Sequence, residues 1–349
     1  MSFGLDCTSF AMSNVVKKNV LLIGGGSVGT IAALNLEAGG LANVTLVLRS
    51  NYNVVNDKGF DIESCDHGAI KGWKPSIVRN TIPDVLKENI EPYDYIVLST
   101  KNTPDIPPTI VDLVQPALPS TNAHTTLVLI QNGLNIEKPF LQSHPKTVVL
   151  SGVSLIGSAE PSPGKIVQGG RDRLLIGAFA NPNLDSTSPA DDAAREFVEI
   201  YAKAGKTDCT FSPNVPHDRW RKSVYTACLS PICAITGLDS GRIHLADGAV
   251  ANLVRPAMRE IVEAAKKSAG VNLGDDVMDF LIGADVLQPC LSPSMLADVQ
   301  KGNFIEFENL LGEPLREGKT VGVAMPTLEV LYQIAKAVQW RTKEQRHLI

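Results

Sequence analysis

Residues 19–29, NVLLIGGGSVG, decide the fold of this chain. The segment Asn19–Ile23 is a short apolar run, typical of a strand buried on both faces of a parallel sheet. Apolar residues with helical spacing follow the glycines, and residues 44–48, VTLVL, form a second apolar run. A strand, a glycine turn, a helix and a strand within about 30 residues predict the βαβ unit of a parallel sheet.

The glycines between this strand and helix have the pattern Gly24-x-Gly26-x-x-Gly29. Gly24 permits a tight turn, Gly26 lets the backbone approach a pyrophosphate, and Gly29 lets the helix pack closely on the strand. Ser27 and Val28 open the helix, where free N–H groups and the positive dipole end favour phosphates. A glycine turn that binds nothing is the alternative. The strand–turn–helix–strand context favours a dinucleotide site.

Arg49 and Ser50 follow the second strand, and Arg49 lies 20 residues after Gly29. Sites for NAD usually carry Asp or Glu here, which bonds the ribose 2′-hydroxyl. A guanidinium and a hydroxyl suit a 2′-phosphate, which a carboxylate would repel. The alternative is a solvated surface arginine. The sequence therefore favours NADP over NAD as the cofactor.

Further apolar runs at 95–99, 126–130 and 147–150 predict more buried strands. Residues 165–177 predict a hairpin that turns near Gly169 and Gly170. A helix over 189–204 and a last strand over 207–211 complete the expected α/β part.

Strand-like runs nearly vanish after residue 212. Six helices are predicted instead, over 219–229, 246–269, 275–281, 295–302, 305–311 and 327–341. We place a boundary within 212–217, where two prolines interrupt both periodicities. The sequence thus predicts a Rossmann-type dinucleotide-binding domain over 1–212 and an all-helical substrate domain over 213–349.

Composition excludes several classes of protein. The chain has 349 residues, 44% hydrophobic and 20% charged, with a net charge of −5. A mildly acidic chain is a poor general nucleic-acid binder. No membrane-spanning segment, signal peptide or transit peptide is recognisable, so we expect a cytoplasmic protein without a membrane partner. The six cysteines form no C-x-x-C pair, the histidines lack metal-ligand spacing, and no G-x-S-x-G motif occurs, so we expect reduced thiols and no metal.

Polar segments follow two predicted strands. Ser99-Thr100-Lys101-Asn102 comes after one, and Gln131-Asn132-Gly133 comes after the next. Ligands of open parallel sheets bind beyond the carboxyl ends of the strands, so Lys101 and Asn132 are candidates for contacts beside a nicotinamide. Ordinary loop residues are the alternative, because Asn-Gly is a common turn.

Two segments of the helical part also carry candidates. Lys222, Thr226 and Ser230 recur every four residues, which would align them on one helix face, with Pro231 ending or kinking that helix. A solvated lysine is the alternative. Ser294 is a candidate N-cap, and Glu306 is a carboxylate among apolar neighbours, either solvated or placed for a purpose.

These motifs, taken in order, resemble the ketopantoate reductases, or 2-dehydropantoate 2-reductases, over about residues 19–340. The resemblance implies a Rossmann-type domain followed by a helical domain, with the active site between them and a role in pantothenate biosynthesis. It further implies reduction of 2-dehydropantoate with NADPH and the possibility of a homodimer.

Carried over by motif, Gly24, Gly26, Gly29 and Arg49 resemble the cofactor contacts. Lys101 and Asn132 resemble the family's residues beside nicotinamide and substrate. Lys222 resembles the catalytic lysine. Ser294 resembles a contact to the substrate carboxylate, and Glu306 a residue near the reacting centre.

The chain departs from the family pattern at three positions. Asparagines of the family align with Thr226, Ser230 and Ser240, which here carry hydroxyls instead. We therefore expect a 2-oxo acid reductase with Lys222 as the general acid, on a substrate that the sequence leaves open. Two alternatives remain: a reductase of another carbonyl or an imine in a secondary pathway, and a non-catalytic NADP(H)-binding redox sensor.

Overall fold

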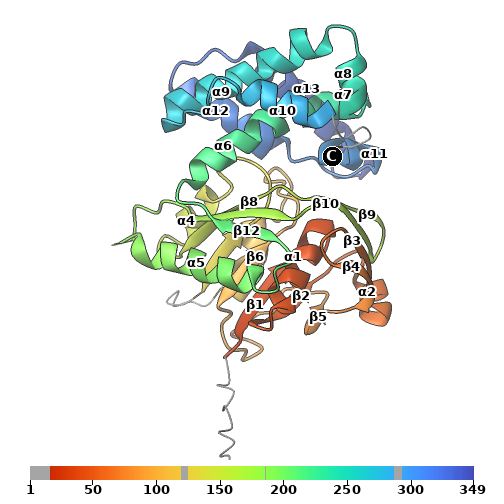
Figure 1. Ribbon diagram of the computed structural model, residues 1–349, viewed down its shortest axis with the longest axis vertical. Helices are drawn as coiled ribbons and strands as arrows, with labels where there is room; N and C mark the ends of the chain where they lie inside the picture. Colours follow the sequence, from red (N-terminus) through yellow and green to blue (C-terminus); the bar gives the residue numbers. More distant parts are fainter. Residues whose placement is uncertain (1–15, 119–124, 185, 287–292) are drawn as a thin grey trace, which may run out of the picture.

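The larger sheet has eight strands in the order β12-β11-β8-β7-β6-β1-β2-β5 among the residues that this computed structural model describes, 16–118, 125–184, 186–286 and 293–349 (Figure 1). Its strands are β1 (Lys18–Ile23), β2 (Ala42–Val47), β5 (Ile77–Arg79), β6 (Tyr95–Leu98), β7 (Thr126–Leu129), β8 (Val149–Ser154), β11 (Arg173–Ala178) and β12 (Asp208–Phe211). Neighbours pair in parallel except β8 and β11, which are antiparallel.

Alternate residues of β1 enter two different cores. Val20 and Leu22 pack into a core with α1 (Ser27–Ala38) and α5 (Ser188–Ala202). Leu21 and Ile23 pack into the core on the other face, which the short helices α3 (Ile110–Val114) and α4 (Lys138–Ser143) cover. The strand is buried on both faces, which explains why its sequence is a continuous apolar run. The predicted Rossmann-type architecture is confirmed.

A second sheet of four strands, which the sequence analysis missed, has the order β4-β3-β10-β9. Its strands are β3 (Phe60–Ser64), β4 (Gly68–Trp73), β9 (Gly157–Ser162) and β10 (Lys165–Gly170), and the helix α2 (Tyr52–Lys58) precedes β3. The hairpin predicted over 165–177 is wrong. β10 instead forms a hairpin with β9, turning at Gly164 with φ +77°, and β11 belongs to the larger sheet.

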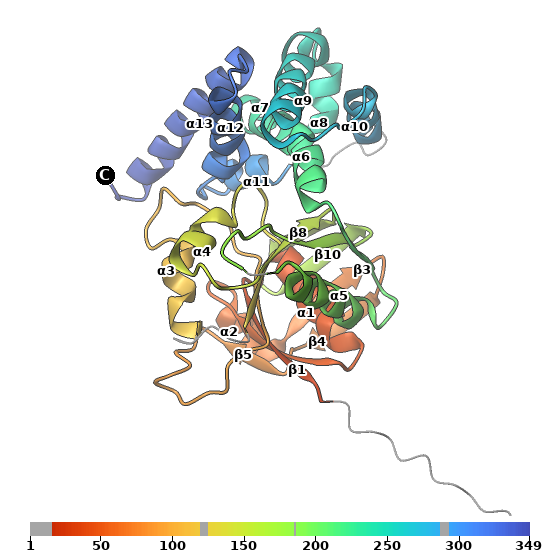
Figure 2. The same ribbon diagram turned by 90° about the vertical axis from the view of Figure 1, so that its left-hand side faces the viewer.

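The helical part stands on the carboxyl edge of the larger sheet, and α6 (Val215–Thr226) leads into it (Figures 1 and 2). The other helices are α7 (Leu229–Thr236), α8 (Ser240–Leu245), α9 (Arg255–Ala269), α10 (Val277–Val286), α11 (Ser294–Gln300), α12 (Glu313–Thr320) and α13 (Pro326–Gln345). Short π-helical turns at Val250–Val254 and Glu308–Gly312 precede α9 and α12. This part has its own core, of residues from all these helices, to which the other half contributes Leu134.

Several helix boundaries differ from the predicted ones. Pro216 does not interrupt a helix. It lies in the first turn of α6, where the N–H groups have no partner within the helix and proline loses no hydrogen bond. The helix predicted over 305–311 starts late: Ile305 and Glu306 lie outside it, and Ile305 donates its N–H to Gln339 Oε1 (3.0 Å). The domain boundary at 212/213 stays a prediction, although the two halves bury separate cores.

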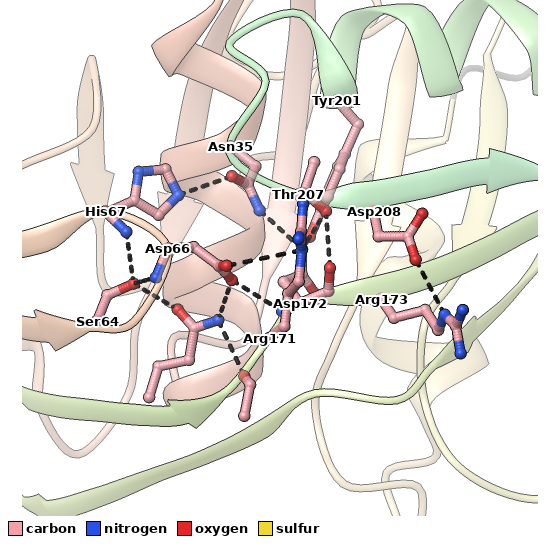
Figure 3. Close-up of polar contacts among 12 residues, drawn as sticks. Asn35, Ser64, Asp66, His67, Arg171, Asp172, Arg173, Tyr201, Thr207 and Asp208 are labelled. Carbon is pink, nitrogen blue, oxygen red and sulfur yellow. Dashed lines mark hydrogen bonds and ion pairs between the residues drawn. The ribbon is translucent and has the colours of Figure 1, made fainter.

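A buried carboxylate joins the second sheet to the helices α1 and α5 (Figure 3). Asp172 lies in the loop between β10 and β11 and is only 2% exposed. Three side chains donate hydrogen bonds to its Oδ2 atom: Asn35 (2.8 Å), Thr207 (2.8 Å) and Tyr201 (3.0 Å). Its own N–H donates to Asp66 Oδ2 (2.8 Å). Burial raises the pKa of Asp172, and its three donors oppose that rise.

We expect Asp172→Ala to destabilise the protein by about 2 kcal/mol or more. The change leaves the buried donors of Asn35 and Tyr201 without their acceptor, and each unsatisfied one costs about 1–3 kcal/mol, while Thr207 can still donate to the main-chain oxygen of residue 172. Asp208→Ala is the matched control, because Asp208 forms an exposed ion pair with Arg173 (3.0 Å) worth about 0–1 kcal/mol. Urea denaturation of both variants measures the difference. Equal losses would contradict the role given to Asp172.

Candidate functional site

The glycine loop joins β1 to α1 through close contacts that leave no room for a side chain at two of its three motif glycines, Gly24 and Gly29. Gly24 has φ +111°, and its carbonyl accepts a hydrogen bond from Ser99 Oγ (2.6 Å) at the end of β6. A Cβ on Gly29 would lie 1.9 Å from Gly24 O. Gly26 differs, since a Cβ there would meet nothing within 4 Å. Packing therefore explains Gly24 and Gly29, whereas open space lies beside Gly26.

The first turn of α1 suits a phosphate. Its N-cap, Gly26, provides no capping side chain, and the turn contains no acidic residue, so the N–H groups of Ser27 and Val28 have no side-chain acceptor among the described residues. This helix end faces the open space beside Gly26, and a pyrophosphate there would meet both N–H groups and the positive dipole end. The residues present thus fit a dinucleotide.

Arg49 and Ser50 are both exposed directly after β2. Arg49 forms no ion pair with the residues that the structure describes, so its guanidinium remains available for a ligand. Asn51, the next residue, is only 6% exposed and donates to Gly25 O (2.8 Å) and Glu160 Oε1 (3.0 Å). The sequence analysis missed Asn51, which fixes the glycine loop from the second strand.

Lys101 lies between two buried carboxylates of the helical part. Its Nζ is 2.6 Å from Asp298 Oδ2 and 3.4 Å from Glu306 Oε2. Glu306 Oε1 also accepts the N–H of Asn102 (2.9 Å). Burial lowers the pKa of Lys101, but the two carboxylates outweigh it and hold the pKa above its usual value. Lys101 is therefore a permanent cation that ties β6 to the helical part.

Whereas Lys101 is held by carboxylates, Lys222 is held by neutral hydrogen-bond acceptors. Its Nζ donates to Asn132 Oδ1 (2.6 Å), after β7, and to Ser154 O (2.6 Å), at the end of β8. Both acceptors are neutral. Burial and the positive charge of Arg219 lower the pKa of Lys222 to about 7, against a smaller opposing effect of Glu306. The structure thus brings Lys101, Asn132, Lys222 and Glu306 together at the carboxyl edge of the sheet.

Arg219 holds α6 on this edge. It is 6% exposed, and its Nε lies 2.9 Å from Oε1 of the fully buried Glu137. Its remaining N–H groups donate to main-chain carbonyls at the ends of β7 and β8: Leu129 (3.0 Å), Gln131 (3.0 Å), Gly133 (2.9 Å) and Gly152 (3.2 Å). The sequence analysis gave Arg219 no role, because nothing in the local pattern separates a buried arginine from a solvated one.

The predicted substrate hydroxyls do not share one helix face. α6 ends at Thr226, whose hydroxyl donates to Lys222 O (3.1 Å), and Ser230 lies buried in the next helix, α7. The prediction of a helix extending to Ser230 is wrong, since the chain turns at 227–228, ahead of Pro231.

The two other predicted hydroxyls lie in contrasting settings. Ser240 is fully buried in the first turn of α8, whereas Ser294 is exposed in the first turn of α11. Ser294 is not the N-cap, because Pro293 occupies that position and its carbonyl accepts the N–H of Ala297 (3.1 Å). Substrate contact by these hydroxyls stays a prediction.

Comparison with known proteins agrees with this geometry. The family profile described as "Ketopantoate reductase PanE/ApbA" matches residues 20–181, and the one described as "Ketopantoate reductase PanE/ApbA C terminal" matches residues 214–339. The chain belongs to the ketopantoate reductase family. The predicted resemblance is confirmed, and with it the class of NAD(P)H-dependent oxidoreductases.

Relatives of this family member cover almost its whole length. It is 35% identical to an uncharacterized protein of Saccharomyces cerevisiae over 350 residues, which cover 95% of this chain and 96% of the relative. It is 24% identical over 330 residues to the 2-dehydropantoate 2-reductase of a Nostoc species, with 94% and 97% covered.

Solved structures repeat the fold. The 2-dehydropantoate 2-reductase of Methylococcus capsulatus is 28% identical, with a TM-score of 0.74 and 93% and 97% of the two chains covered. D-mandelate dehydrogenase with NADH and anilino(oxo)acetate is 17% identical, with a TM-score of 0.77 and 93% and 99% covered, a likeness of fold alone. Within the described residues, no helix is long and apolar enough to cross a membrane, and no group of three His, Cys, Asp or Glu could hold a metal.

Two glycine substitutions separate packing from ligand binding in the loop. We expect Gly29→Ala to lower the melting temperature, because its Cβ would collide with the main-chain oxygen of Gly24. Gly26→Ala should lower the melting temperature far less, since its φ of −73° suits alanine and its Cβ would meet no atom of the described residues within 4 Å. It should instead weaken NADPH binding at least tenfold, as titration calorimetry would show. Unchanged affinity in Gly26→Ala would place the dinucleotide elsewhere.

Proposed function

We propose that this protein reduces a 2-oxo acid to a 2-hydroxy acid with NADPH, and that Lys222 is the general acid. The observation that carries the proposal is the setting of Lys222, a lysine with a pKa of about 7 between two neutral acceptors. A group of this pKa is poised to exchange a proton at neutral pH. The open first turn of α1 lies at the same edge of the sheet.

The cofactor, when bound, supplies a hydride to the carbonyl carbon of the substrate. The residues that would hold it are Gly24, Gly26 and the N–H groups of Ser27 and Val28 at the pyrophosphate, with Arg49 at the 2′-phosphate. Asn132 and Lys101 follow the two neighbouring strands and would border the nicotinamide and the substrate.

Lys222 meets the charge that the reaction creates. Negative charge grows on the carbonyl oxygen, and the ammonium stabilises it before Nζ passes its proton to that oxygen and becomes a neutral amine. Asn132 holds Nζ in place through its Oδ1. Glu306 keeps Lys101 charged and fixed at this edge of the sheet, and Ser294 would contact the substrate carboxylate.

The pKa of Lys222 gives the reaction a pH dependence of defined sign. Reduction requires the ammonium, so kcat/KM for reduction should fall about tenfold per pH unit above pH 7, whereas the rate of oxidation of the 2-hydroxy acid should rise to a plateau there.

Lys222→Ala should lower kcat by about 10²–10³ and leave NADPH affinity intact, because the lost contact forms mainly in the transition state. Equal loss of NADPH binding, or an unchanged rate, would refute this role.

The choice of NADPH over NADH rests on Arg49. We expect Arg49→Asp to raise the KM for NADPH at least tenfold and to change that for NADH little, since a carboxylate repels the 2′-phosphate. Steady-state kinetics with both cofactors measures the ratio. A wild-type enzyme that uses NADH as well as NADPH would contradict the assignment.

The substrate of this family member differs, we propose, from 2-dehydropantoate. Asparagine offers an acceptor and two donors on a longer arm than the hydroxyls of Thr226, Ser230 and Ser240. Loss of three amides should relax the demand for a substrate hydroxyl and widen the pocket. This observation favours a 2-oxo acid with a larger or apolar side chain.

A panel of 2-oxo acids with NADPH tests this substrate assignment. We expect larger or apolar acids to exceed 2-dehydropantoate in kcat/KM, and the triple change Thr226→Asn, Ser230→Asn, Ser240→Asn to reverse the order. A wild-type preference for 2-dehydropantoate would restore the family's named activity. Tight NADPH binding with no turnover of any carbonyl or imine would identify a redox sensor instead of a reductase.

A further inference from the structure

Arg219 contacts the main chain on both sides of Asn132, the residue whose side chain accepts a hydrogen bond from Lys222. Its NH1 atom donates to the carbonyls of Gln131 and Gly133, which flank Asn132. The side chain of Asn132 accepts the hydrogen bond of Lys222 Nζ. One guanidinium nitrogen therefore fixes the loop that contains Asn132, the first hydrogen-bond acceptor of Lys222.

The same guanidinium also fixes the strand that provides the second acceptor. Its NH2 atom donates to Gly152 O (3.2 Å), and its Nε donates to Ser151 Oγ (2.5 Å). Both residues belong to β8, whose last residue, Ser154, accepts from Lys222 through its carbonyl (2.6 Å). Arg219 thus connects the two segments between which Lys222 Nζ is held.

The positive charge of Arg219 also acts on Lys222. Arg219 precedes Lys222 by three residues on α6, so the two side chains emerge on neighbouring positions of one helix face. Within the described part of the chain, the charged groups that act on Lys222 are Arg219, which disfavours its ammonium, and Glu306, which favours it. Glu137, fully buried, faces Arg219 and is linked to it again through Ser151.

We propose that Arg219 is a positioning residue for Lys222: it holds both hydrogen-bond acceptors of that lysine and places a fixed positive charge beside it. Glu137 and Ser151 in turn hold Arg219. This inference rests on the proposed role of Lys222 as the acid. Docking of α6 explains the hydrogen bonds to the strand-end carbonyls, whereas a fixed positive charge three residues before Lys222 also acts on the proton equilibrium of that lysine.

A direct titration of Lys222 tests the inference without any substrate. The rate at which acetic anhydride acetylates Lys222 is followed against pH by peptide mass spectrometry, which reports the pKa of that amine whether or not the protein turns over. The double variant Arg219→Met, Glu137→Leu removes both charges together, and no buried charge is left alone. Arg219→Lys keeps the positive charge but removes the planar guanidinium and its set of N–H donors. Arg221→Gln is the matched control, an arginine of the same helix that lies over the ring of Phe280 (5.1 Å).

We expect the double variant to raise the pKa of Lys222 by about one unit, which is about a fivefold loss of neutral amine at pH 7, and to shift the pH profile of kcat equally. Arg219→Lys should keep the pKa within about half a unit and lower kcat about tenfold through lost geometry. Arg221→Gln should change neither. An unchanged pKa and rate in both Arg219 variants, or the same shift in Arg221→Gln, would overturn the inference. A shifted pKa in a protein with no turnover would uphold it and refute the proposed function.

Discussion

The buried guanidinium of Arg219 is the contact on which the arrangement of the two halves depends. The carboxyl edge of a parallel sheet presents a row of carbonyl oxygens, and covering them with a helix leaves them without partners unless a donor is supplied. Arg219 supplies donors to four such carbonyls from one side chain. Because Glu137 balances its charge, α6 can lie directly on the strand ends and bring Lys222 to them.

Two further contacts hold the halves in the same relation. Gly133, with φ +108°, packs so closely on Asn309 that a Cβ would lie 2.5 Å from that residue's own Cβ. Asn309 and Leu134 share a main-chain hydrogen bond (2.9 Å). On the other side, the buried Gln339 of α13 bonds both Ile305 and Asp105 (3.0 and 3.1 Å). The loops after β6 and β7, which contain the cofactor-side candidates, are thereby bound to the helical part.

Two lysines at this junction have opposite electrostatic settings. Lys101 has two carboxylates beside it and keeps its charge, whereas Lys222 has two neutral acceptors and a neighbouring cation and loses its proton easily. Environments that push the pKa values of like groups apart are a general way to assign roles in a site. On this basis Lys222 suits proton transfer, whereas Lys101, paired with two carboxylates, is a fixed tie between β6 and the helical part.

The sequence by itself determined the parts of this protein that depend on neighbours along the chain. Residues 19–29 specify the strand, turn and helix of the dinucleotide fold, because doubly buried strands and glycine turns have local signatures. The second sheet and the burial of Asp172 have no such local signature, since each depends on residues distant along the chain. Lys222 could be named from its motif, but its lowered pKa could not, because burial and the charge of Arg219 arise only once α6 lies on the sheet.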